Sequence, residues 1–182
     1  MTVIVEKINH PKYKPDIYAA SKDERFRYLL GSKGKRMLVA FGINPSKANR
    51  VRSDATVTRV IRTAAKNGFD GWLMMNVSPE RSTDPKNLGA QSLKDKHQKN
   101  RMAFRRILET FPDYACLGAW GNLIESRPYL KECLRDLLGE TSLSDRDWFC
   151  FGATANGHPR HPSRAGYEDF QPFDIESYRS KL

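Results

Sequence analysis

Four short apolar runs, each followed by polar residues, form the main pattern along the chain. The runs cover residues 36–41, 72–76, 114–119 and 148–151. Continuous apolar runs of about four to eight residues are typical of strands that are buried on both faces of a sheet. The pattern therefore predicts a buried strand at each of these positions.

Helical periodicity fills the segments between the runs. A helix is expected to begin at Ser53-Asp54, where either residue is a good N-cap, and to end at Gly68. Further helices are expected over residues 93–110 and 123–138. Strands that alternate with helices predict an α/β fold. We expect a three-layer α/β/α sandwich around a central parallel four-stranded sheet.

The length of the chain, 182 residues, fits one domain with a core of its own. We expect residues 1–182 to form a single α/β domain, with residues 1–30 as an N-terminal extension packed on it. No internal repeat or low-complexity segment divides the sequence.

The chain lacks an apolar run of the length, about 18 residues, that spans a membrane. Residues 1–7 lack the basic start and long apolar core of a signal peptide. The three cysteines are widely spaced, and two of them fall in predicted strands. They are interpreted as reduced core residues. We therefore expect a cytoplasmic protein without membrane contact.

Basic residues outnumber acidic ones, with 31 Lys and Arg against 21 Asp and Glu, so that the net charge is +10. This excess favours an anionic partner, and nucleic acid is the commonest one. The alternative interpretation is that the charge serves solubility alone. We expect DNA or a nucleotide as the partner and a monomeric protein.

A polar motif stands at or after the end of each predicted strand. Residues 42–45 (Gly-Ile-Asn-Pro) follow the first, Asn76 ends the second, Trp120-Gly121 follows the third, and residues 161–164 (His-Pro-Ser-Arg) come after the fourth. Ligands bind in open α/β sheets at the carboxyl ends of the strands. The four motifs therefore predict one site assembled from the whole chain.

In type and order, these motifs resemble those of the mismatch-specific branch of the uracil-DNA glycosylase superfamily. A closer resemblance, over about residues 25–165, is to the domain-of-unknown-function family 1643 (DUF1643). The matching segments of this chain are Asn44-Pro45-Ser46, Asp54-Ala55-Thr56, Asn76, Asp84-Pro85, Ala119-Trp120-Gly121 and residues 157–162. The second resemblance carries no activity with it, so the functional expectations come from the glycosylase likeness and from residue chemistry.

The glycosylase resemblance implies a role for one residue of each of three motifs. Asn44 would position the attacking water through its amide oxygen, or it merely starts a turn before Pro45. Asn76 would read the edge of a pyrimidine, or it bonds to local backbone. His161 would donate a hydrogen bond to the charge that develops on the departing base, or it is structural.

Other residues have more than one interpretation. Asp54 is the carboxylate near the first motif, and it is either a helix N-cap or the true general base. Phe41 stacks on a base or packs in the core. Trp120-Gly121 is interpreted as a packing motif. Candidates for phosphate contacts are Ser46, Lys47, Arg50, Arg52, Arg160, Ser163 and Arg164.

The chain departs from the glycosylase pattern at two points. The aspartate and tyrosine that the most active uracil enzymes carry in the first motif are absent, since Pro45 is followed by Ser46, and no leucine wedge follows Ser163. We expect a DNA-acting N-glycosylase-like enzyme that needs neither a metal nor a cofactor. The alternatives are a non-catalytic nucleic-acid- or nucleotide-binding protein and a hydrolase of small nucleosides or nucleotides.

Overall fold

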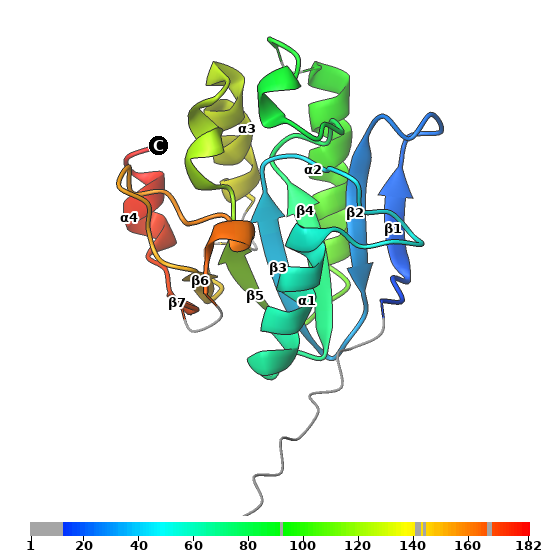
Figure 1. The fold of residues 1–182 in the computed structure, drawn as a ribbon, viewed down its shortest axis with the longest axis vertical. Coiled ribbons are helices and arrows are strands. Elements are labelled where there is room, and N and C mark those ends of the chain that lie inside the picture. Colours follow the sequence, from blue (N-terminus) through cyan, green and yellow to red (C-terminus); the bar gives the residue numbers. More distant parts are fainter. Residues whose placement is uncertain (1–12, 92, 141–142, 144, 167–168) are drawn as a thin grey trace, which may run out of the picture.

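The fold is an α/β arrangement built on a mixed sheet of seven strands (Figure 1). The computed structural model describes residues 13–91, 93–140, 143, 145–166 and 169–182, and only the backbone of Arg164. The strands are β1 (Ile17–Ala20), β2 (Arg27–Ser32), β3 (Arg36–Gly42), β4 (Gly71–Asn76), β5 (Asp113–Gly118), β6 (Trp148–Cys150) and β7 (Gln171–Pro172). They lie in the order β1-β2-β4-β3-β5-β6-β7.

The four strands predicted from the apolar runs are β3, β4, β5 and β6, and they pair in parallel in the order β4-β3-β5-β6. The predicted extent of the sheet was wrong, because three antiparallel strands extend it at its two ends. β1 and most of β2 come from residues 1–30, which the sequence assigned to the N-terminal extension. β7 has two residues, too few to leave a pattern in the sequence.

Helices cover both faces of the sheet (Figure 1). α1 (Ala55–Lys66) packs on one face with the apolar residues Leu38 and Ala40 of β3. α2 (Lys94–Leu108), α3 (Pro128–Leu138) and α4 (Ile175–Arg179) contribute to the core on the other face, which β3 meets with Met37, Val39 and Phe41. Successive residues of a strand point to opposite faces, so one buried strand supplies both halves of the core.

The ends of the helices follow from local chemistry. Asp54 caps α1, and its Oδ1 accepts a hydrogen bond from the Val57 amide at 2.9 Å. After α1, Gly68 adopts the left-handed conformation at φ +76°, which a residue without Cβ adopts at little cost. α3 begins at Pro128, later than predicted, because proline favours the first helical position and the preceding Gly121–Glu125 forms a 3₁₀ turn instead.

The topology places a crevice between β3 and β5. From β3 the chain crosses through α1 to β4 on one side, and from β5 it crosses through α3 to β6 on the other side. The loops that leave two neighbouring strands in opposite directions open a crevice at their carboxyl ends, where ligands of such sheets bind. Across the described part of the chain, every helix is too short or too polar to cross a membrane.

Candidate functional site

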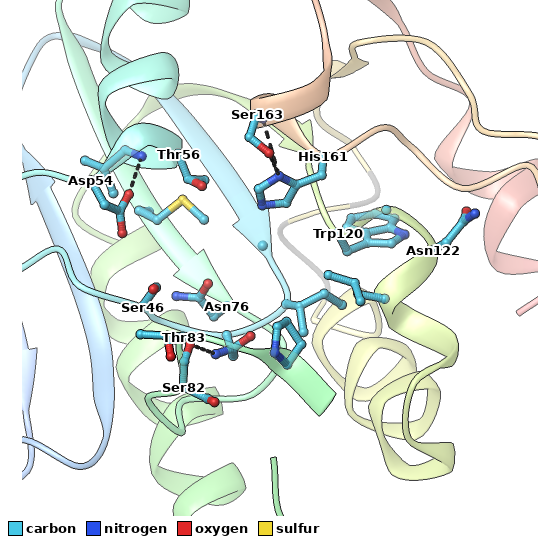
Figure 2. A pocket seen from close by; sticks show the side chains of 18 of the residues that line it. Ser46, Asp54, Thr56, Asn76, Ser82, Thr83, Trp120, Asn122, His161 and Ser163 are labelled. Carbon is cyan, nitrogen blue, oxygen red and sulfur yellow. Dashed lines mark hydrogen bonds between the residues drawn. The ribbon is translucent and has the colours of Figure 1, made fainter. Parts of the chain in front are cut away.

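A cavity of about 550 Å³ lies at the carboxyl ends of β3 and β4 and beside the loop that follows β5 (Figure 2). Asn44, Asn76, Trp120 and His161, one residue from each of the four motifs, all line it. Figure 2 shows Ser163 and His161 on one wall and Ser46, Asn76 and Ser82 on another. The structure therefore brings the four motifs together around one space.

The Asn44 side chain is held in one orientation by two carbonyl groups. Its Nδ2 donates to the Ser82 carbonyl oxygen at 2.8 Å and to the Pro45 carbonyl oxygen at 2.9 Å. Both partners only accept, so the amide nitrogen must face them. Within the described chain, Oδ1 of Asn44 accepts no hydrogen bond. The amide oxygen is thus the atom that is left to accept from a ligand or a water.

Both carboxylate oxygens of Asp54 accept hydrogen bonds from backbone amides. Oδ1 caps α1 through Val57, and Oδ2 accepts from the Ala48 amide at 3.2 Å. This second bond ties the loop after β3 to the start of the helix. Asp54 also lines the cavity. The N-cap interpretation is confirmed, and a role as general base stays a prediction.

The Asn76 amide is a bridge in the cavity wall. Asn76 is 1% exposed. In the amide orientation that satisfies both of its groups, its nitrogen donates to the Asn44 carbonyl oxygen at 3.3 Å and its oxygen accepts from Arg27 Nη2 at 3.2 Å. One N–H and one lone pair then remain to meet a ligand.

Arg27 is a cavity residue that the sequence reasoning missed. Its side chain is 2% exposed, lines the cavity and donates from Nη1 to the Ala48 carbonyl oxygen at 3.0 Å. Burial, and after it the neighbouring charge of Arg81, lower the pKa of Arg27 to about 10. No alternation or motif marks this arginine, and arginine is seldom buried. Arg27 remains a cation at neutral pH inside the wall of the cavity.

Arg81 supports the same wall from behind. Its Nη1 donates to the carbonyl oxygens of Ser46 at 2.8 Å and Ala48 at 3.0 Å, while its Nη2 lies 3.2 Å from Glu24 Oε2. Two arginines thus share the Ala48 carbonyl and fix the loop that follows β3. A loop held by so many backbone contacts presents its side chains in defined positions.

His161 has a defined proton position in its neutral form. Its Nδ1 accepts from the Ser163 amide at 3.3 Å and lies 2.8 Å from Ser163 Oγ (Figure 2). A backbone amide only donates, so Nδ1 is the acceptor and the ring proton of neutral His161 is on Nε2. The arrangement makes His161 a hydrogen-bond donor through Nε2.

Trp120 belongs to a buried chain of hydrogen bonds behind the cavity. Its Nε1 donates to Tyr178 Oη at 2.9 Å, and Oη lies 2.8 Å from His158 Nδ1. His158 Nε2 lies 3.2 Å from Glu125 Oε1, and a carboxylate oxygen only accepts, so the ring proton of neutral His158 is on Nε2. His158 Nδ1 then accepts from the Tyr178 hydroxyl. Burial raises the pKa of Tyr178 to about 12.

Gly121 links this chain to the histidine loop. Its amide donates to the Pro159 carbonyl oxygen at 2.8 Å, and its backbone is left-handed at φ +61°. A Cβ at this position would lie 3.4 Å from His161 Cβ. That distance is an ordinary van der Waals contact, so it is the left-handed backbone, and not a lack of space, that favours glycine beside His161.

The remaining predicted site residues divide into two groups. Ser46, Ser163 and Arg160 line the cavity, and Arg160 Nε donates to the Ala153 carbonyl oxygen at 3.0 Å. The other group is exposed in the loop after β3 and lies outside the cavity; it consists of Lys47, Arg50 and Arg52. The side chain of Arg164 lies outside the described residues.

Phe41 does not line the cavity. It is fully buried on the α2 side of the sheet, 5.3 Å from the ring of Phe104 and 4.9 Å from that of Trp148. Its position fits the core interpretation. Polar residues that the sequence reasoning did not single out as site residues also line the cavity, and these are Thr56, Ser82, Thr83, Asn122 and Thr154. They make the walls rich in hydroxyl groups.

Neither a curated protein nor a solved structure matches the chain. One family model, described as "protein of unknown function (DUF1643)", matches residues 27–163. The match begins at Arg27 and ends at Ser163, and both residues line the cavity. It covers well over half of the sequence, so the chain belongs to the DUF1643 family.

Proposed function

We propose that this protein hydrolyses the N-glycosidic bond of a nucleotide unit, in DNA or in a free nucleotide. The orientation of Asn44 carries the proposal. Two carbonyl groups hold its amide nitrogen, which leaves the oxygen to place a water. His161, a donor through Nε2 when neutral, lines the same cavity. A water-placing acceptor and a hydrogen-bond donor are the two groups that this reaction needs.

The reaction assigns a separate task to each group. The water oxygen attacks C1′ of the sugar, and the electron pair of the C1′–N bond leaves with the base. His161 donates a hydrogen bond to the base atom that gains negative charge. The proton that the water loses passes to solvent, because an amide orients a water without deprotonating it. Such chemistry is slower than one with a carboxylate base, which fits the absence of an aspartate from the first motif.

The topology supports this assignment. The strands β4-β3-β5-β6 pair in parallel, helices lie on both faces, and the cavity is at the carboxyl ends of the strands. We infer a sandwich of the uracil-DNA glycosylase type, with three antiparallel strands added at its ends. The order of the motifs along the chain is the one that this type has.

The surroundings of the cavity fit an anionic polymer as the carrier of the nucleotide. Lys47, Arg50 and Arg52 are exposed on the loop whose inner residues line the cavity, and Arg160 lines the opposite part. Exposed cations beside a polar cavity bind phosphates by releasing counterions, so their contribution falls with salt.

A non-catalytic binding function is the second candidate. The Asn76 amide and both oxygens of Asp54 are engaged by the protein itself, which leaves fewer groups for chemistry than the sequence suggested. A protein of this kind would hold a nucleotide without releasing its base.

A mass-spectrometric screen for released bases tests the proposal. DNA with varied modified pyrimidines and the corresponding free nucleotides are incubated with the parent protein and with His161→Ala. We expect the parent to release at least one base, and the variant to do so about 10²- to 10³-fold more slowly. Salt-sensitive DNA binding by a folded parent protein that releases no base would overturn the hydrolase in favour of the binding function.

A further inference from the structure

Arg27 is a buried cation in the cavity wall that makes no salt bridge among the described residues. The charge of Asp54 acts on it from a greater distance, and both oxygens of that carboxylate accept from backbone amides. Among the described residues, no acidic group lies within 4.0 Å of its guanidinium, and Nε of Arg27 has no hydrogen-bond partner at all. Its two contacts are to neutral oxygens, the Ala48 carbonyl and the Asn76 amide. A buried charge without a partner is costly, which is why buried arginines are normally paired with anions.

The donor capacity of Arg27 is only partly used. A guanidinium has five N–H groups in a planar fork, and the two contacts occupy two of them. Three donors remain, including the one on Nε. This fork matches the oxygen atoms of a phosphate, which accepts several hydrogen bonds at once.

The start of α1 lies near Arg27, because the Ala48 carbonyl accepts from Arg27 and the Ala48 amide donates to Asp54, the cap of this helix. Thr56 and Val57, in the first turn of this 12-residue helix, line the cavity together with Arg27. The Asp54 carboxylate caps this N-terminus and already offsets part of the positive end of the helix dipole, so Arg27 is the main source of positive charge for a ligand here. The hydroxyls of Ser46 and Thr56 supply neutral donors; Figure 2 shows them on the same side of the cavity as Asp54.

We propose that Arg27, Ser46 and Thr56, here called the Arg27 corner, bind a terminal phosphate group of the substrate. The inference rests on the proposed function and narrows its substrate to a free nucleotide or a nucleotide at a chain end. A phosphate inside a DNA strand carries a sugar on both sides and runs along the protein surface. A phosphate that reaches a side chain with 2% exposure must end its chain.

Calorimetric titration of the full chain tests the Arg27 corner. The protein is His161→Ala, so that turnover does not deplete the ligand, and the probes are nucleoside monophosphates, the matching nucleosides and inorganic phosphate. We expect each monophosphate that binds to do so about 10- to 100-fold more tightly than its nucleoside, with phosphate as a competitor. Equal affinities of nucleoside and monophosphate, without competition by phosphate, would overturn the proposal.

Three variants locate the effect in the same background. Arg27→Gln removes the cation, and Thr56→Val removes a hydroxyl without changing the size of the side chain. Arg62→Gln removes a cation from an exposed position of the same helix and serves as the control. We expect the first to abolish the preference for the monophosphate, the second to reduce it several-fold, and the control to keep it. If Arg27→Gln fails to fold, Thr56→Val decides, and an unchanged preference in that variant contradicts the proposal.

The outcomes separate this proposal from the proposed function. Base release by the parent protein, combined with equal binding of nucleoside and monophosphate, overturns the Arg27 corner alone. Phosphate-dependent binding without base release supports the Arg27 corner and overturns the hydrolase.

Discussion

Trp120 donates a hydrogen bond from Nε1 to Tyr178 Oη at 2.9 Å, and thereby joins the loop after β5 to the C-terminal helix. Tyr178 lies beyond the segment that matches the family description, which ends at Ser163. The C-terminal helix α4 is therefore a support for the cavity wall. The packing interpretation of Trp120 agrees with this contact, since the indole is fully buried between aromatic rings.

Tyr178→Phe should destabilise the protein. The change leaves the buried Trp120 Nε1 and His158 Nδ1 without their partner, and an unsatisfied buried polar group costs about 1–3 kcal/mol. The free energy of unfolding in urea measures the loss. Tyr28→Phe is the control, because the Tyr28 hydroxyl makes no hydrogen bond within the described residues and its loss should cost little. Equal losses in both variants would contradict this account.

Stability should fall at alkaline pH through Tyr178. Burial raises its pKa from the ordinary 10.0 to about 12. Between these values the unfolded chain loses the phenolic proton while the folded chain keeps it, so the stabilisation present below pH 10 is lost as the pH rises toward 12. The difference in unfolding free energy between the parent and Tyr178→Phe should therefore shrink between about pH 10 and about pH 12. A difference independent of pH would exclude this cause.

Gly121→Ala should disturb His161, whereas Gly157→Ala should not. Both glycines have positive φ, +61° and +78°, so alanine at either position costs about 1–2 kcal/mol of backbone strain. A Cβ at Gly121 would be in van der Waals contact with His161, so the backbone shift that relieves the strain is transmitted to His161, whereas nothing lies within 4 Å of a Cβ at Gly157. We expect similar losses of stability and a lower rate of base release in Gly121→Ala only. Equal rates in the two variants would show that the contact with His161 is unimportant.

Asp54→Asn should keep activity, and Asn44→Ala should lose it. Asparagine retains most of the N-capping ability of aspartate, so α1 should remain intact. Asn44→Ala removes the amide oxygen proposed to place the water, while the cavity is otherwise preserved. Initial rates of base release, measured on variants that retain the circular dichroism of the parent, test the pair. An inactive Asp54→Asn beside an active Asn44→Ala would make Asp54 the general base.

Monophosphate binding should depend on pH through Arg27. Burial, and after it the charge of Arg81, lower the pKa of Arg27 to about 10, and the groups that oppose this shift are Asp54, Tyr18 and Tyr13. The cation is therefore intact at neutral pH and is lost as the pH rises through about 10. Affinity should stay level from about pH 7 to pH 9 and then fall, and Arg27→Gln should remove the fall. Calorimetric titration across this pH range measures the affinity. If the parent and Arg27→Gln show the same pH profile, Arg27 is not the source of the pH dependence.

The sequence predicted the parallel strands and the gathering of the motifs well, because strands buried on both faces leave continuous apolar runs. The N-cap at Asp54 and the end of α1 at Gly68 were also readable, since each depends on chemistry within a few residues. The start of α3 was misjudged because apolar spacing continues through the 3₁₀ turn before Pro128.

The N-terminal strands and Arg27 were beyond the reach of the sequence pattern. β1 is a four-residue edge strand of mixed polarity, and edge strands need no continuous apolar run. Arg27 begins β2 and is buried only because the loop containing Ala48 lies over it, a contact 21 residues away in the chain. The roles of Asn44 and Asn76 likewise depended on amide orientations that distant carbonyls and an arginine decide.

Two of the three buried cysteines can be used to measure how the sheet opens. Cys116 lies in β5, inside the sheet, whereas Cys150 lies in the three-residue strand β6. Both thiols are buried, so an alkylating reagent reaches them only when the structure around them opens, and burial also raises the pKa of each thiol. Short strands near the edge of a sheet open more readily than central strands. The alkylation rate of Cys150 should therefore report local opening of β6, and that of Cys116 should report global unfolding. The rates at which Cys150 and Cys116 are alkylated therefore report two different opening reactions of the same sheet.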